Sequence, residues 1–163
     1  MNGGNDDFVE LYNPTSTPVT LDSTWKLEAR SNTAATYGTR WTGTGEVIAA
    51  HGHYLVTGET YADLPPGDGT LSSGITDATS LQLTQSGAVI DAVCYAFSLT
   101  TSTPFTTDAT YTCEGTPADN SAHDNSGATD VNVSIERKGG HCTDTGNNAA
   151  DFIVQSPATP MGS

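Results

Sequence analysis

Basic residues are scarce in this sequence. Lysine and arginine together number 5, against 19 aspartates and glutamates, and the formal net charge at pH 7 is -14. A surface with this balance repels phosphate backbones and anionic lipid head groups. The composition therefore argues against a nucleic-acid partner, and it favours cations, positively charged partners or good solubility alone.

Long apolar runs are also missing. No stretch approaches the roughly 18 consecutive apolar residues that a membrane span requires. The opening residues, MNGGNDD, lack both the basic and the apolar region of a secretory signal. The sequence thus predicts no membrane span, and the loop-like Asn-Gly-Gly after Met1 is typical of a piece cut from a longer protein.

Charged residues of either sign make up 15% of the chain, where about 25% is ordinary. Threonine, serine, asparagine and glycine supply the polarity instead. This composition suits many short strands and turns, because threonine favours strands while glycine and asparagine favour turns. At 163 residues the chain fits one domain that buries roughly 70% of its unfolded surface.

Short alternating stretches recur, and no window shows an apolar stripe of helical period. Strands are expected at 7–13, 17–21, 25–30, 46–50, 53–58, 80–85, 88–96 and 131–138, and a short turn makes 81–96 a hairpin. This rhythm predicts an all-β sandwich or barrel. The predicted core consists of Val9, Leu11, Val19, Leu21, Trp25, Leu27, Tyr54, Val56, Leu81, Leu83, Val89, Val93, Ile135 and Phe152.

Two long polar segments, at about 58–79 and 99–130, interrupt the strands. Insertions of that length usually carry function or need a clamp. Cys113 and Cys142 lie in polar segments, and a disulfide between them is expected to clamp the second insertion, with a stabilisation of about 3 to 4 kcal/mol. Cys94 lies in an apolar strand and reads as a buried thiol. Such a disulfide would indicate a secreted or cell-surface protein.

Five motifs occur in one order between residues 6 and 160: DFVELYNPTSTPVTLDSTWKLE, AAHGHYLVTG, LQLTQSGAVIDAVCYA, SIERKGG and NNAADFIVQSPATP. Together they resemble the lamin tail domain as it occurs in bacterial exported proteins. The resemblance implies a single immunoglobulin-like β-sandwich domain over 1–163. It also implies a non-catalytic binding or spacer module, since no catalytic residues are assigned to that family as a whole.

The chain departs from the family pattern in two ways. Family members generally begin with a strand reading Ile-Asn-Glu-Val, which is missing here, and the insertion before SIERKGG is unusually long. A sheet edge without that strand would invite pairing with another chain, so an edge-strand dimer is one expectation. A protein or cell-surface partner is the other.

Glu10, His51 and His53 are the candidates for chemistry in the strands. Alternation points Glu10 away from the core, towards an ion pair with Arg30 or Arg137. An accessory domain or a weak hydrolase is a further alternative, and a hydrolase would need Glu10 or the His51/His53 pair in a concave pocket with at least two convergent titratable groups. A structural role for all three residues is favoured.

Acidic and amide-rich loops at 3–7, 118–130 and 143–148 give the clearest chemical signal. Calcium takes six to eight oxygen ligands from such loops. The candidate metal ligands are Asp119, Asp124, Asp130 and Asp144, although the spacing lacks the EF-hand pattern. A calcium-stabilised module is therefore the alternative to a plain binding or spacer module.

Overall fold

The computed structural model describes residues 6–63, 65–123, 133–140 and 143–160. Strands dominate these residues, and the predicted all-β sandwich is confirmed. The strands are β1 (Phe8–Tyr12), β2 (Val19–Leu21), β3 (Trp25–Ser31), β4 (Gly38–Thr42), β5 (Glu46–Ile48), β6 (His53–Thr57), β7 (Gly69–Thr70), β8 (Thr79–Gln85), β9 (Ala88–Ala96), β10 (Ala118–Asp119), β11 (Ser134–Arg137) and β12 (Phe152–Gln155). The helices are α1 (Leu99–Thr107), α2 (Asn148–Asp151) and the single 3-10 turn η1 (Ser121–His123).

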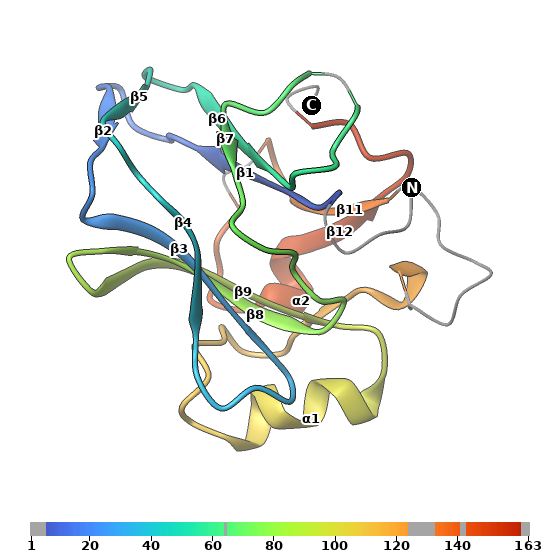
Figure 1. Cartoon of the computed structure of the whole chain (residues 1–163). Coiled ribbons are helices and arrows are strands. Elements are labelled where there is room, and N and C mark those ends of the chain that lie inside the picture. Colours follow the sequence, from blue (N-terminus) through green and yellow to red (C-terminus); the bar gives the residue numbers. More distant parts are fainter. Residues whose placement is uncertain (1–5, 64, 124–132, 141–142, 161–163) are drawn as a thin grey trace.

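Two sheets form the layers. One has five strands in the order β10-β9-β8-β3-β4, and the other has three in the order β1-β6-β7. Figure 1 shows the three-stranded sheet above the five-stranded one, with α1 beneath β8 and β9. Two further antiparallel pairs, β2–β5 and β11–β12, extend the structure at its sides.

The main core lies between these layers. Leu11, Leu21, Leu27, Tyr54, Val56 and Leu81 are buried there as predicted, and Val9, Val19, Trp25, Leu83 and Val93 pack against it half-buried. Trp41, 6% exposed, is the buried tryptophan of this core, and the sequence reading missed it. Val89 is wrong as a core residue, because the tip of the β8–β9 hairpin is exposed and leaves Val89 46% accessible. Ile135 and Phe152 are half-buried in the β11–β12 pair.

A second, smaller core covers the other face of the five-stranded sheet. Ala78, Cys94 and Ala96 meet Phe105 of α1 and Tyr111 there. The helix begins at a capping box, in which Ser98 and Thr101 each satisfy the backbone of the other. The insertion expected at 99–130 is therefore partly helical, and it buries Phe105 edge-on against Tyr111, with ring centroids 5.0 Å apart.

The disulfide joins Cys94 to Cys113, with Cα atoms 5.3 Å apart. The predicted partner of Cys113 was wrong, because a sulfur forms one disulfide and Cys113 uses it on β9. Cys94 is buried, as its apolar strand predicts, but it is disulfide-bonded and not a thiol, because the small core beside α1 brings the segment after Tyr111 directly against it. Cys142 lies outside the described residues.

Candidate functional site

Three carboxylates from separate parts of the chain come together beside α2. Glu114 follows the disulfide at Cys113, Asp144 lies in the loop before α2, and Asp151 is the last residue of that helix. One ligand atom of each lies within 4.8 Å of the other two. We call these three residues the carboxylate cluster.

The loop that carries Asp144 is built around the buried carboxylate of Asp151. Asp151 Oδ2 accepts hydrogen bonds from the backbone N–H groups of Thr145 (2.9 Å) and Asn147 (3.3 Å), and Oδ1 accepts one from the Thr145 hydroxyl (2.7 Å). Burial acts to raise the pKa of Asp151, but these hydrogen bonds outweigh it and lower that pKa below its ordinary value. Asp151 therefore stays ionised and fixes the loop.

Arg137 on β11 supplies the positive charge beside the cluster. Its Nη2 donates to Asp91 Oδ1 at 2.8 Å, while Nη1 donates to the carbonyl of Thr143 at 3.0 Å and lies 3.8 Å from Asp144. The guanidinium also lies 4.7 Å from the centre of the Phe152 ring. One guanidinium thus faces several carboxylates, and negative charge remains in excess.

The excess of negative charge affects the pKa of Glu114. Partial burial raises its pKa first, and the negative charges of Asp91, Asp144 and Asp151 raise it further. A bound cation would relieve this repulsion. Carboxylate oxygens on a loop are the ligands that calcium prefers, so the arrangement is chemically suited to a divalent cation.

Asn148 anchors the cluster to the sheet. Its side chain is fully buried, and its Oδ1 accepts from the backbone N–H of Cys94 at 2.9 Å while Nδ2 donates to the carbonyl of Ala92 at 3.2 Å. Nδ2 also donates to Glu114 Oε2 at 3.3 Å. A single amide therefore connects β9, the disulfide-bonded segment and α2.

The predicted calcium ligands divide into three groups. Asp144 belongs to the carboxylate cluster, as above. Asp119 is exposed, and it accepts hydrogen bonds from the backbone and hydroxyl of Ser121, two residues further on. Asp124 and Asp130 lie outside the described residues. Glu114 and Asp151 were missed, because only tertiary contacts bring them to Asp144.

Glu10 and His53 lie on neighbouring antiparallel strands, and their side chains pair at 2.5 Å between Oε1 and Nδ1. The expected ion pair of Glu10 with Arg30 or Arg137 is wrong, since Arg30 pairs with Asp108 and Arg137 pairs with Asp91 and Asp144. Both partners are largely shielded, with side chains 17% and 22% exposed, and Tyr12 packs against the imidazole at 4.9 Å.

His51 does not share the strand with His53. It lies in the preceding turn with a φ of 54° and is exposed. The two histidines therefore do not present their imidazoles from one strand. Asn13 stabilises the turn after β1, since its Oδ1 accepts from the N–H of Thr15 at 3.0 Å.

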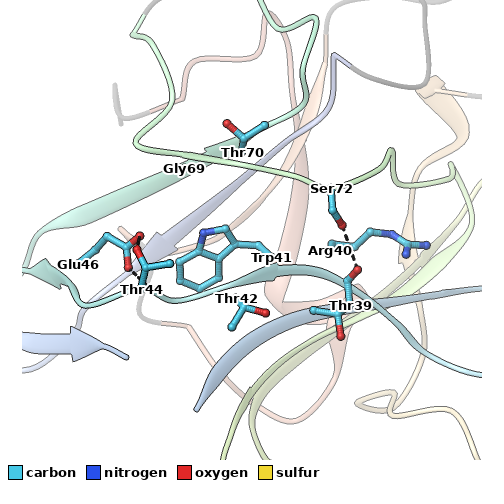
Figure 2. A pocket seen from close by; sticks show the side chains of 9 residues that line it. All are labelled: Thr39, Arg40, Trp41, Thr42, Thr44, Glu46, Gly69, Thr70 and Ser72. Carbon is cyan, nitrogen blue, oxygen red and sulfur yellow. Dashed lines mark hydrogen bonds between the residues drawn. The ribbon is translucent and has the colours of Figure 1, made fainter. Parts of the chain in front are cut away.

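Two hollows mark the surface. One, of about 600 Å³, lies between α1, β10 and β12, and its lining includes Phe97, Leu99, Pro117, Phe152 and Ile153. We call it the apolar groove. The other, of about 480 Å³, lies beside Trp41, and the residues that line it include Thr39, Thr42, Thr44, Thr70 and Ser72 (Figure 2). We call it the hydroxyl groove.

Within the described residues, no helix is both long and apolar enough to cross a membrane. No protein-family model matches the chain. No curated protein matches it either. The resemblance to the lamin tail domain thus stays a prediction that rests on the five sequence motifs.

Proposed function

We propose that this chain is a non-catalytic binding module of an exported bacterial protein, and that it binds a protein or cell-surface partner through the apolar groove. The observation that carries the proposal is the exposure of large apolar side chains there. Leu99 is 84% exposed and Ile153 is 43% exposed. Apolar residues gathered at a hollow, rather than scattered singly, are typical of interaction sites.

The walls of the apolar groove are held in place by the rest of the fold. One wall is α1, which Phe105 anchors in the small core, and another is the segment after Cys113, which the disulfide holds on β9. A wall that is ordered before binding loses less conformational entropy when a partner docks. Asp119 at the rim and the net charge of -14 favour a partner whose apolar contact is surrounded by basic groups.

The test uses purified bacterial cell envelopes as the probe, in a sedimentation assay with the folded chain. Leu99→Asp and Ile153→Asp should each weaken association by about tenfold, the scale of a lost apolar contact at an interface. Val47→Asp is the matched control, because Val47 is 59% exposed on β5, outside the groove. Equal loss in all three variants, or no loss in the first two, would contradict the proposal. A spacer role would then be the remaining reading of the resemblance.

Calcium stabilisation is the second candidate function, and the carboxylate cluster favours it. Calcium should raise the melting temperature of the chain, and a chelator should reverse the rise. Asp144→Asn and Glu114→Gln should remove the response, whereas the exposed Glu59→Gln should keep it. An unchanged melting temperature at millimolar calcium would exclude this candidate. The hydrolase alternative, which uses Glu10 or the His51/His53 pair, stays a prediction.

A further inference from the structure

The hydroxyl groove lies where the two sheets come together at one open side of the sandwich. β4 is the edge strand of the five-stranded sheet, and β7 is the edge strand of the three-stranded one. The segment after β7 reaches β4 directly, because the N–H of Ser72 donates to the carbonyl of Arg40 at 2.7 Å. Ser72 Oγ also donates to the carbonyl of Thr39 at 3.2 Å, as Figure 2 shows.

The floor of this groove is fixed by packing. Trp41 is held against Tyr54, with ring centroids 5.5 Å apart. Gly69 lies over both, and a Cβ at that position would lie 2.8 Å from the Tyr54 hydroxyl and 2.9 Å from Trp41 Nε1. Only glycine fits there, so the floor has no side chain of its own from β7.

Hydroxyl groups line the walls, and they come from both edges. Thr39, Thr44, Thr70 and Ser72 are exposed, and Thr42 is half-buried. A hydroxyl both donates and accepts hydrogen bonds. The hydroxyls of Thr44 and Ser72 already donate to Glu46 and to the Thr39 carbonyl, so they offer acceptors to a ligand, whereas those of Thr39, Thr42 and Thr70 can do both.

A fixed carboxylate lies at one end. Glu46 accepts hydrogen bonds at 2.7 Å from both the backbone N–H and the hydroxyl of Thr44. Burial works to raise the pKa of Glu46, but the hydrogen bonds from Thr44 outweigh it and lower that pKa to about 2. Glu46 is thus an ionised acceptor at any physiological pH.

A guanidinium lies at the other end. Among the described residues, Arg40 makes one hydrogen bond, from Nη1 to the carbonyl of Gly38 at a long 3.4 Å, and its buried Nε has no partner. The Nη groups carry further N–H donors for a ligand, whereas the buried Nε is out of a ligand's reach. Figure 2 shows Glu46 and Arg40 on opposite sides of Trp41.

The chemistry of the groove selects among occupants. An added peptide strand needs the edge carbonyls of β4, and Ser72 already uses those of Thr39 and Arg40. A polyanion would meet Glu46 and a net charge of -14, and a polycation, which that net charge attracts, would have to place a positive group beside Arg40 at one end of the groove. A neutral ligand with many groups that both donate and accept hydrogen bonds is compatible with the hydroxyls, with Glu46 and with Arg40.

We propose that the hydroxyl groove binds a neutral glycan segment, with Glu46 and Arg40 hydrogen-bonded to sugar hydroxyls at its two ends. This goes beyond the proposed function, because it concerns a site remote from α1. Trp41 is only 6% exposed, so recognition rests on hydrogen bonds and little on stacking. The expected affinity is therefore millimolar, and useful binding would come from repeated engagement along a polymer.

The experiment is an NMR titration of the isotope-labelled chain with cellohexaose, xylohexaose, maltohexaose and chitohexaose. At least one should produce saturable shifts at Trp41 and Thr70. Arg40→Ala and Glu46→Gln should each weaken that binding by about tenfold, the scale of a lost hydrogen bond to a charged group. Lys26→Ala and Glu59→Gln are the matched controls, since both residues are exposed and neither lines the groove.

Thr70→Val distinguishes a loss of binding from a loss of fold, because Thr70 is exposed and the change keeps the side-chain shape. It should weaken binding while leaving the melting temperature unchanged. The proposal is overturned if none of the four oligosaccharides gives saturable shifts at the groove. Binding that survives in Arg40→Ala, Glu46→Gln and Thr70→Val would overturn it as well.

Discussion

Replacing Asn148 with alanine should be among the most damaging single changes in this chain. Among the described residues, β10 pairs with β9 at Tyr95 and Ala96 alone, and no described strand borders the edge of β9 next to Cys94. The Asn148 amide takes the place of one: it accepts from the N–H of Cys94 and donates to the carbonyl of Ala92. This single side chain continues the ladder of the sheet.

The cost follows from what alanine leaves behind. Cys94 is fully buried and Ala92 is 4% exposed, so water cannot replace the lost partners easily. An unpaired buried backbone group costs about 1 to 3 kcal/mol, and two such groups give a loss of about 2 to 6 kcal/mol. That is a large part of the stability of an ordinary domain, which is about 5 to 15 kcal/mol.

Urea unfolding at neutral pH, followed by tryptophan fluorescence, measures the loss directly. Asn32→Ala is the control, because Asn32 is a half-buried asparagine outside the sheet edge, and it should change the unfolding free energy little. Asn148→Asp keeps the acceptor for Cys94 but places a negative charge beside Glu114, so it should destabilise most at neutral pH and least in acid. A loss under about 0.5 kcal/mol for Asn148→Ala would refute the reasoning, because it would mean that the two backbone groups find other partners.

Two further predictions concern the disulfide and the hydroxyl groove. A non-reduced digest should link the peptides that contain Cys94 and Cys113, and Cys113→Ala should cost about 3 kcal/mol in unfolding free energy, since the bridge spans 19 residues; a linked Cys142 peptide would contradict this pairing. Because the pKa of Glu46 is lowered from 4.5 to about 2, its ionised form stabilises the fold above about pH 4.5, and this contribution disappears as the pH falls towards 2. The melting-temperature gap between the wild-type chain and Glu46→Gln should therefore narrow over that interval, and a gap as wide at pH 2 as at pH 7 would contradict the assignment.

The strands that alternate were predictable from the sequence because one face of each meets the core. The expected strands at 7–13, 25–30 and 80–85 correspond to β1, β3 and β8 within a residue or two. β9 shows where the rule fails. Val93 packs against the main core while Cys94 lies in the small core, so both faces of this strand are buried at its second half. A reading that assumes one solvent face cannot anticipate the second core.

β4 was missed for a related reason. Its sequence, GTRWT, has a single large apolar residue, so it carries no alternation to detect. Trp41 is nevertheless more deeply buried than Trp25, whose side chain is only partly covered. Either tryptophan could have been the more deeply buried one. Which of them is depends on the position of β4 at the edge of the sheet, and this is set by tertiary contacts.

The predicted cysteine pairing was wrong and the predicted metal ligands omitted Glu114 and Asp151, and both misses have the same physical cause. The small core under α1 draws the segment after Tyr111 onto β9, which places Cys113 on Cys94 and Glu114 beside Asn148. Asn148 opens α2, and that helix brings Asp151 and the preceding loop to the same place. The insertion therefore does not hang from the sandwich as a clamped loop. It is folded onto the sheet by its own apolar residues, and the cluster and the apolar groove are both built on that contact.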